Sequence, residues 1–424
     1  MAVHRFLKRW CRTLSLMVVV VLCFGLWQTV SDRQKLAQLR IPEQYSLDLP
    51  RCSAVIMEEI PDNKADLEKL LSSRRREHLP ETFYINATKD CRSYTENREF
   101  IKIPLSLEEE EFPIAYSMVI HEKIEMFERL LRAVYAPQNI YCVHVDQKSS
   151  EDFKKAVRGI VSCFPNVFVA SKLESVVYAS WYRVQADLNC MKDLMDSHVQ
   201  WKYLLNTCGT DFPIKTNRQM VQAMKSLNGR NSMESTVPPD YKKPRWEYHF
   251  ITNKTIMRTN EKKSPPPINT PISCGSAYFV VTRDFVRHVL EDKGVEKFLE
   301  WGKDTYSPDE YLWATLQRMP SVPGSLPANK MFDVYDVTAI ARAVKWYAFT
   351  GNMKDRALYP PCRGIIRREV CVYGLGDITW LMKQQHLLAN KFDSEVDDVV
   401  IRCLESVLYF KALTDSQKTL PFHF

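Results

Sequence analysis

A carboxylate, Glu310, is the strongest candidate for chemistry in this chain of 424 residues. It lies in the stretch DTYSPDEYLWAT (residues 304–315), where Ser307, Pro308 and Glu310 have the types and spacing of the N-cap, first and third residues of a helix. The helix dipole would favour an ionised carboxylate there, and a fixed, ionised carboxylate can act as a general base that removes a proton from a hydroxyl group. The same pattern also permits a purely structural role, in which Glu310 accepts a hydrogen bond from the backbone N–H of Ser307.

The elements that must position this carboxylate begin near Phe112, where strands and helices start to alternate. Short apolar runs indicate strands, and apolar residues at helical spacing indicate helices. The predicted strands are 114–120, 140–145, 167–170, 202–206 and 276–281, and the predicted helices include 124–134 and 181–191. This alternation is typical of an α/β protein with an open, mostly parallel sheet and helices on both faces. His121 and Asp146 follow two of the strands, at the edge where ligands bind in such sheets. The segments 238–271 and 320–327 are predicted to run over the surface.

The N-terminus predicts a membrane anchor. Residues 13–31 carry no charge and are long enough to cross a bilayer as a helix, and they follow a tail, residues 1–12, with four basic residues and no acid. The positive-inside rule places the tail in the cytosol and the remainder in the lumen of the secretory pathway. A cleaved signal peptide is the alternative, but no clear small-x-small cleavage site follows the run. We therefore expect a single-pass type II protein with a stem and lead-in over residues 32–111 and a catalytic domain over residues 112–424.

Cysteine usage, sequons and charge agree with a luminal protein. Ten of the twelve cysteines follow the anchor, where disulfides persist, and without a CxxC pair the sequence gives little support for a zinc site. Asn86 and Asn253 lie in Asn-x-Thr sequons for N-glycosylation. The net charge of +7 falls to +3 without the tail, which excludes the strongly basic character of a nucleic-acid-binding domain.

Cations near the C-terminus are candidates for binding an anionic substrate group. A luminal α/β protein of this kind is expected to be a Golgi enzyme that acts on a nucleotide-sugar. Many such enzymes hold the diphosphate through a metal on an Asp-x-Asp triplet, which this chain lacks. The diphosphate charge must then be met by protein cations. Arg367, Arg368 and Lys391 are the candidates, although basic side chains are most often ordinary surface charges.

Six motifs carry a family resemblance. Segments 115–121 (AYSMVIH), 139–146 (NIYCVHVD), 177–190 (VYASWYRVQADLNC), 208–215 (CGTDFPIK), 304–315 and 389–393 (ANKFD) resemble the core 2 β-1,6-N-acetylglucosaminyltransferases, especially the mucin-type members. The resemblance implies a metal-independent GT-A-like glycosyltransferase fold without a cofactor. The implied reaction is the inverting transfer of N-acetylglucosamine (GlcNAc) from UDP-GlcNAc, in β-1,6 linkage. The implied acceptor is the N-acetylgalactosamine (GalNAc) of Galβ1-3GalNAc on mucin-type glycoproteins, which is core 2 branching.

The resemblance also implies roles for individual residues. Glu310 would be the catalytic base, and Asp309 a structural neighbour rather than a second catalyst. Arg368 and Lys391 would bind the diphosphate in place of a metal. Without the resemblance, a strand-end role would explain His121 and a core role would explain Trp346. The uridine and ribose of UDP-GlcNAc would lie against Val119, Ile120, His121, Asp146, Gln147, Lys148 and Tyr178, and the acceptor disaccharide would contact Glu234, Lys242, Arg245, Glu310 and Trp346.

The resemblance implies a disulfide framework, which sequence alone does not determine. Cys208 would be a free thiol, and Cys274, which stands where relatives carry Ser or Thr, would be a second. The implied pairs are Cys52–Cys403, Cys91–Cys163, Cys142–Cys190 and Cys362–Cys371.

Two other departures from the family pattern concern the acceptor. Ala348 stands where the leukocyte-type enzyme has an acceptor-contacting Tyr, and Tyr182 replaces a usual Ser. They leave open whether core 4 and I-branched products are made alongside core 2.

Two other classes remain as alternatives. A luminal glycan-binding protein without turnover would not need an intact base and two phosphate-binding cations. A protein O-xylosyltransferase is a more distant relative, and the motifs match it less well. The sequence also leaves open whether the protein forms a homodimer.

Overall fold

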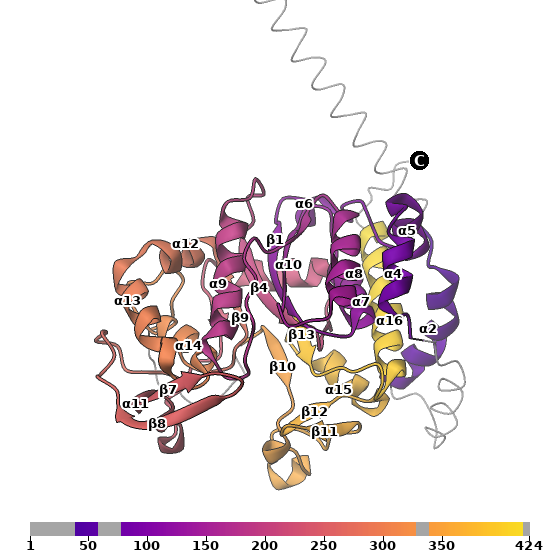
Figure 1. Ribbon diagram of the computed structural model, residues 1–424. Coiled ribbons are helices and arrows are strands. Elements are labelled where there is room, and N and C mark those ends of the chain that lie inside the picture. The colour runs from indigo at the N-terminus through magenta and orange to yellow at the C-terminus, as the bar shows by residue number, and fades with distance from the viewer. Residues whose placement is uncertain (1–38, 58–77, 328–338, 419–424) are drawn as a thin grey trace, which may run out of the picture.

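The computed structural model of the protein describes residues 39–57, 78–327 and 339–418 (Figure 1). The predicted tail and anchor lie outside these ranges, as do parts of the predicted stem. Within the described ranges, no helix is both long and apolar enough to cross a membrane.

A six-stranded sheet forms the centre of the described fold. Its order is β3-β2-β1-β4-β9-β6; the first four strands run parallel, and β9 is antiparallel to both of its neighbours. All residues of β1 and β2 are buried, as expected for parallel strands covered on both faces. The prediction of a mostly parallel α/β sheet is therefore confirmed. The strands are β1 (Ile114–Ile120), β2 (Ile140–Val145), β3 (Val167–Val169), β4 (Tyr203–Cys208), β6 (Ser232–Met233) and β9 (Phe279–Thr282).

Helices cover both faces of this sheet (Figure 1). Alternate residues of β1 point to opposite faces and so pack against different helices. Tyr116 and Met118 belong to a hydrophobic cluster with α7 (Ile124–Val134), α8 (Glu151–Ser162) and α10 (Asn217–Ser226). Ala115 belongs to a second cluster, on the opposite face. That cluster contains α9 (Trp181–Met195), α12 (Arg283–Glu291), α13 (Lys293–Trp301) and α14 (Leu312–Leu316).

Smaller sheets flank the central one. The three-stranded sheet β10-β13-β5 joins β10 (Arg342–Val344), β13 (Leu388–Asn390) and β5 (Asp211–Pro213). Strands β11 (Ile365–Arg367) and β12 (Val370–Val372) form one hairpin. Strands β7 (Tyr248–Thr252) and β8 (Ile256–Lys262) form another, which projects at the edge of the molecule in Figure 1. The predicted surface excursion over residues 238–271 therefore contains a hairpin, preceded by the short helix α11 (Pro244–Glu247).

Segments ahead of residue 112 also pack on this body. Helix α2 (Glu43–Ile56) lies along the C-terminal helix α16 (Asp398–Lys418), which follows α15 (Ile378–Lys383). Helix α4 (Glu81–Ala87) lies against α8, next to α5 (Cys91–Asn97), and α6 (Leu107–Glu110) contacts α10. The parts of the predicted stem that the structure describes are thus folded against the sheet domain.

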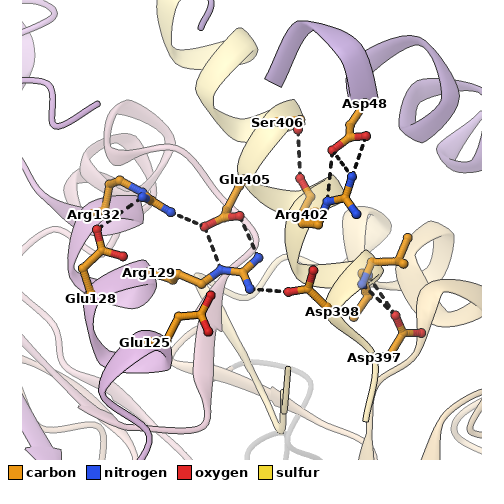
Figure 2. A network of polar contacts seen from close by, with 12 residues as sticks. Asp48, Glu125, Glu128, Arg129, Arg132, Asp397, Asp398, Arg402, Glu405 and Ser406 are labelled. Atoms are coloured by element: carbon orange, nitrogen blue, oxygen red, sulfur yellow. Dashed lines mark hydrogen bonds and ion pairs between the residues drawn. The ribbon is translucent and has the colours of Figure 1, made fainter. Parts of the chain in front are cut away.

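Buried ion pairs join these helices (Figure 2). Arg402 of α16 donates from Nε and Nη2 to the carboxylate of Asp48 in α2, at 2.7–3.1 Å. Arg129 and Arg132 of α7 both reach Glu405 of α16, at 2.6–3.0 Å. These side chains are at most 5% exposed, so each charge depends on its partner for compensation.

The four implied disulfides are present. Cys52–Cys403 joins α2 to α16, Cys91–Cys163 joins α5 to the end of α8, and Cys142–Cys190 joins β2 to α9. Cys362–Cys371 links the segment before β11 to β12. Among the described cysteines, Cys208 and Cys274 are free.

Candidate active site

The backbone around Glu310 differs from the predicted capping box. Ser307 adopts a left-handed conformation with φ of 46°, and its side chain caps nothing. Its backbone N–H donates to the carbonyl of Ala179 at 2.7 Å, so it is not available to the side chain of Glu310. A single 3-10 turn over Pro308–Glu310 precedes α14. The predicted capping box is therefore wrong, and with it the capping alternative for Glu310.

Two cations take the place of the helix dipole beside Glu310. Its Oε2 accepts hydrogen bonds from Arg245 Nη1 at 2.5 Å and Lys242 Nζ at 3.4 Å. The guanidinium of Arg245 also lies 5.4 Å from the centre of the Tyr306 ring, which restricts its position. The Glu310 side chain is 32% exposed, so it is held by cations and still open to a ligand.

Glu234 lies on the same side as these residues. The backbone N–H of Gly275 donates to the carbonyl of Glu310 at 2.7 Å. A Cβ atom on Gly275 would lie only 2.0 Å from the carbonyl oxygen of Glu234, so glycine is required for this close approach. Four of the five implied acceptor residues, Glu234, Lys242, Arg245 and Glu310, are thus brought together around Gly275.

Trp346, the fifth implied acceptor residue, comes from a different part of the fold. It pairs with Val370 of the β11–β12 hairpin in an isolated bridge and is 38% exposed. Ala348 follows on the same exposed segment, between the exposed rings of Tyr347 and Phe349. None of the described contacts joins Trp346 to Glu310.

The residues assigned to uridine and ribose lie at the carboxyl ends of neighbouring strands. Val119 and Ile120 end β1, and the N–H of Asp146, which follows β2, donates to the carbonyl of Ile120 at 2.9 Å. The N–H of Gln147 donates to Glu174 at 3.1 Å, and Lys148 Nζ to the carbonyl of Val176 at 2.6 Å. His121 is exposed, and its carbonyl accepts a hydrogen bond from Ser149 Oγ at 2.7 Å. These bonds bring residues 119–121, 146–148 and the loop that leads to Tyr178 into one group.

The implied diphosphate cations adjoin this group. Arg368 lies 5.1 Å from the centre of the Tyr178 ring, which is 70% exposed. Partial burial raises the pKa of Tyr178, the charges of Tyr306 and Glu310 raise it further, and the charge of Arg368 lowers it, so Tyr178 is within electrostatic reach of both Glu310 and Arg368. Burial also lowers the pKa of Lys391, and the charge of Arg368 lowers it further. Arg368 and Lys391 are therefore close enough for their charges to interact.

Asp309 has an environment that the sequence did not reveal. Its side chain is partly buried, and its buried Oδ1 has no hydrogen-bond partner among the described residues. Burial and the neighbouring charge of Glu310 raise the pKa of Asp309 to about 7, although Arg183 partly offsets this. The family resemblance implied only a structural neighbour of Glu310 at this position. A run of polar residues carries no signal that distinguishes a buried carboxyl from an exposed one.

The free thiols and the sequons have distinct surroundings. Burial raises the pKa of both thiols, that of Cys274 to about 11, and Cys208 lies within 3.4 Å of the hydroxyls of Thr210 and Tyr278. Asn253 is exposed at the turn of the β7–β8 hairpin. Asn86 is exposed near the end of α4, where its Oδ1 accepts a hydrogen bond from Lys89.

The structure is a mixed α/β fold with a mostly parallel central sheet, in which Glu310 is held by two cations. Residues 114–382 match the sequence family described as "Branch: Core-2/I-Branching enzyme", and the chain belongs to this family.

Relatives are similar over most of their length. A Homo sapiens protein named beta-1,3-galactosyl-O-glycosyl-glycoprotein beta-1,6-N-acetylglucosaminyltransferase 3 is 57% identical over 380 residues, 88% of this chain and 85% of that protein. The Mus musculus protein of the same name is 57% identical, and a similarly named protein of Bovine herpesvirus 4 is 56% identical, with the same coverage. The solved 4-diphosphocytidyl-2C-methyl-D-erythritol synthase of Anaerococcus prevotii covers 47% of this chain and 87% of its own, at 9% identity and a TM-score of 0.24, too distant to inform the site.

Proposed function

We propose that this protein transfers GlcNAc from UDP-GlcNAc to the 6-hydroxyl of GalNAc in Galβ1-3GalNAc on mucin-type glycoproteins, which forms the core 2 branch. The observation that carries the proposal is the position of Glu310. It is held by Lys242 and Arg245, meets Glu234 through Gly275, and acts electrostatically on Tyr178, over whose ring Arg368 lies. The names and similarity of the relatives support the same reaction.

The chemistry requires one base and two cations. Glu310 accepts the proton of the attacking hydroxyl, whose oxygen forms a bond with C1 of GlcNAc from the face opposite UDP. The bond between C1 and the diphosphate oxygen breaks, its electron pair stays with UDP, and the configuration at C1 is inverted. Arg368 and Lys391 stabilise the charge that develops on the diphosphate, so the proposed reaction needs no metal.

Arg245 and Lys242 have a role before the acceptor arrives. Both bind Oε2 of Glu310, so they hold the carboxylate in place. Their remaining donor groups suit the hydroxyls of the acceptor disaccharide, and Glu234 is placed to accept from it. Trp346 offers an exposed ring for a sugar face from the hairpin side of the site.

We also propose that the protein is a single-pass type II protein of the Golgi membrane with its catalytic domain in the lumen. The uncharged run over residues 13–31, the basic tail and the four disulfides support this location. The small side chain of Ala348 supports a broad acceptor range that includes core 4 and I-branched products.

A product analysis tests the function. The purified full-length protein is incubated with UDP-GlcNAc and core 1, core 3 or poly-lactosamine acceptors, and the linkage of each product is determined by NMR. We expect β-1,6-linked GlcNAc on the GalNAc of core 1. Glycan binding without any product would favour the glycan-binding alternative. Transfer of xylose from UDP-xylose to a serine peptide, without GlcNAc transfer, would favour the O-xylosyltransferase alternative.

A further inference from the structure

One buried carboxylate, Asp393, joins segments that surround the proposed diphosphate site. Its Oδ1 accepts a hydrogen bond from Lys123 Nζ at 2.6 Å, and its Oδ2 accepts one from Arg367 Nη1, also at 2.6 Å. The Asp393 side chain is 2% exposed. Burial would raise the pKa of Asp393, but the hydrogen bonds from Lys123 and Arg367 hold it below its usual value. The ionised form of the carboxylate is therefore favoured between two cations.

Each segment that meets at Asp393 carries a residue assigned to the donor. Lys123 follows the end of β1, two residues after His121. Arg367 immediately precedes Arg368 at the tip of the β11–β12 hairpin. Asp393 itself lies two residues after Lys391.

Two of these segments have strained backbones close to their contact with Asp393. Lys123 has φ of 59°, and Arg368 and Glu369 have φ of 51° and 62°, all in the left-handed region that residues with a Cβ atom rarely adopt. The turn between β11 and β12 consists of these last two residues, a geometry usually made by Asn and Gly. Such conformations persist only where surrounding contacts impose them. The ion pairs of Lys123 and Arg367 with Asp393 are contacts of this kind.

We propose that Asp393 is a positioning residue for the donor diphosphate: by holding Lys123 and Arg367, it fixes the β1–α7 loop and the hairpin tip so that Arg368 and Lys391 face the same phosphates. The inference rests on the proposed function, because it takes the diphosphate of a nucleotide-sugar as the ligand. Asp393 touches neither substrate nor reacting atoms in this role.

Replacement of Asp393 by Asn distinguishes a role in positioning Arg368 and Lys391 from a simple effect of its negative charge on UDP binding. The variant keeps the size of the side chain and removes one negative charge close to Arg367 and Lys391. If charge alone mattered, the more positive site would bind UDP more tightly. If Asp393 positions the cations, the loops relax and UDP binds more weakly. We expect a loss on the order of 10-fold, comparable to the loss when outer contacts that orient ligating groups are removed.

The experiment is a calorimetric titration of the full-length protein with UDP, and Asp48→Asn is the matched control. Asp48 is also a buried carboxylate paired with an arginine, but it joins α2 to α16 rather than the donor segments. We expect about 10-fold weaker UDP binding by Asp393→Asn and unchanged binding by Asp48→Asn. Unchanged or tighter UDP binding by Asp393→Asn would overturn the inference, and so would an equal loss in the control. Absence of UDP binding by the wild-type protein would instead overturn the proposed function.

A second variant, Arg367→Gln, tests the proposal even if Asp393→Asn does not fold. Arg367 is 47% exposed, so Arg367→Gln is expected to fold. It should raise the KM for UDP-GlcNAc and leave the KM for the acceptor unchanged. When Arg367→Gln is already present, Asp393→Asn should reduce UDP affinity by a smaller factor than it does in the wild type, because part of its effect acts through Arg367. Full additivity of the two losses, or an equal rise in both KM values, would contradict a positioning role.

Discussion

Loss of Asp48 should destabilise the whole protein, although Asp48 lies far from residue 112, where the predicted catalytic domain begins. Its carboxylate receives three contacts from Arg402, at 2.7, 2.8 and 3.1 Å, and the two side chains are 3% and 5% exposed. In Asp48→Asn the guanidinium keeps its charge and loses the buried carboxylate of Asp48. Removal of one partner from such a pair typically costs about 3–5 kcal/mol.

The expected shift in melting temperature follows from the size of the protein. With roughly 350 described residues and an unfolding entropy of about 2.1 cal/mol/K per residue, 3–5 kcal/mol corresponds to a decrease of about 4–7 °C. The Cys52–Cys403 disulfide still holds α2 against α16, so the helix should remain attached. The decrease in melting temperature therefore measures the loss of the ion pair and not the detachment of α2.

Differential scanning calorimetry measures this shift. Glu43→Gln, an exposed acid in the first turn of the same helix, is the control and should change the melting temperature by less than 1 °C. A double variant, Asp48→Leu with Arg402→Met, should recover most of the stability, because it removes both charges. A decrease below 1 °C for Asp48→Asn would refute the reasoning, since α2 would then not belong to the cooperative folding unit.

Three further predictions concern the site. Activity should survive excess EDTA; loss of activity with EDTA and its rescue by manganese would show that a metal holds the diphosphate. Arg368→Ala should weaken UDP-GlcNAc binding by roughly 1.5–3 kcal/mol, the value of a charge-assisted contact. Ala348→Tyr should narrow the acceptor range toward core 1, measured as the ratio of core 1 to core 3 rates, and an unchanged ratio would place the selectivity elsewhere. The raised pKa of Asp309 means that its contribution to stability is present below about pH 4 and is lost as the pH rises through about 7. Above pH 7, Asp309→Asn should therefore have a higher free energy of unfolding than the wild type, by up to roughly 4 kcal/mol. This difference should disappear near pH 4, and chemical denaturation at both pH values measures it.

The sequence predicted the central sheet well because its strands are short apolar runs that are buried on both faces. β1 and β2 coincide with the predicted strands 114–120 and 140–145, and α7 with the predicted helix 124–134. The hairpin β7–β8 was not predicted, because β7 is mostly half-buried, β8 is largely exposed and carries three charged residues, and the two strands show no regular alternation of apolar and polar side chains. Its structure depends on tertiary contacts such as the ion pair of Lys263 with Asp304, next to its second strand.

The sequence predicted the identity of the candidate base better than its environment. The spacing of Ser307 and Glu310 fits a capping box, but a tertiary bond from Ser307 to Ala179 overrides the local preference. In the sequence, Asp393 is only the last residue of the motif 389–393 (ANKFD), and nothing there indicates its partners. Its partners Lys123 and Arg367 are 270 and 26 residues away along the chain, and local spacing cannot reveal such contacts.

The turnover rate of Glu310→Gln tests whether Glu310 is the general base. Glutamine keeps the size of the side chain and can still contact Arg245, but it cannot accept the proton of the acceptor hydroxyl. We measure kcat with UDP-GlcNAc and core 1 acceptor, together with UDP binding as a control for folding. We expect a loss on the order of 10²–10⁴-fold in kcat with near-normal UDP binding. Retention of more than about a tenth of the wild-type kcat would show that Glu310 is not the general base.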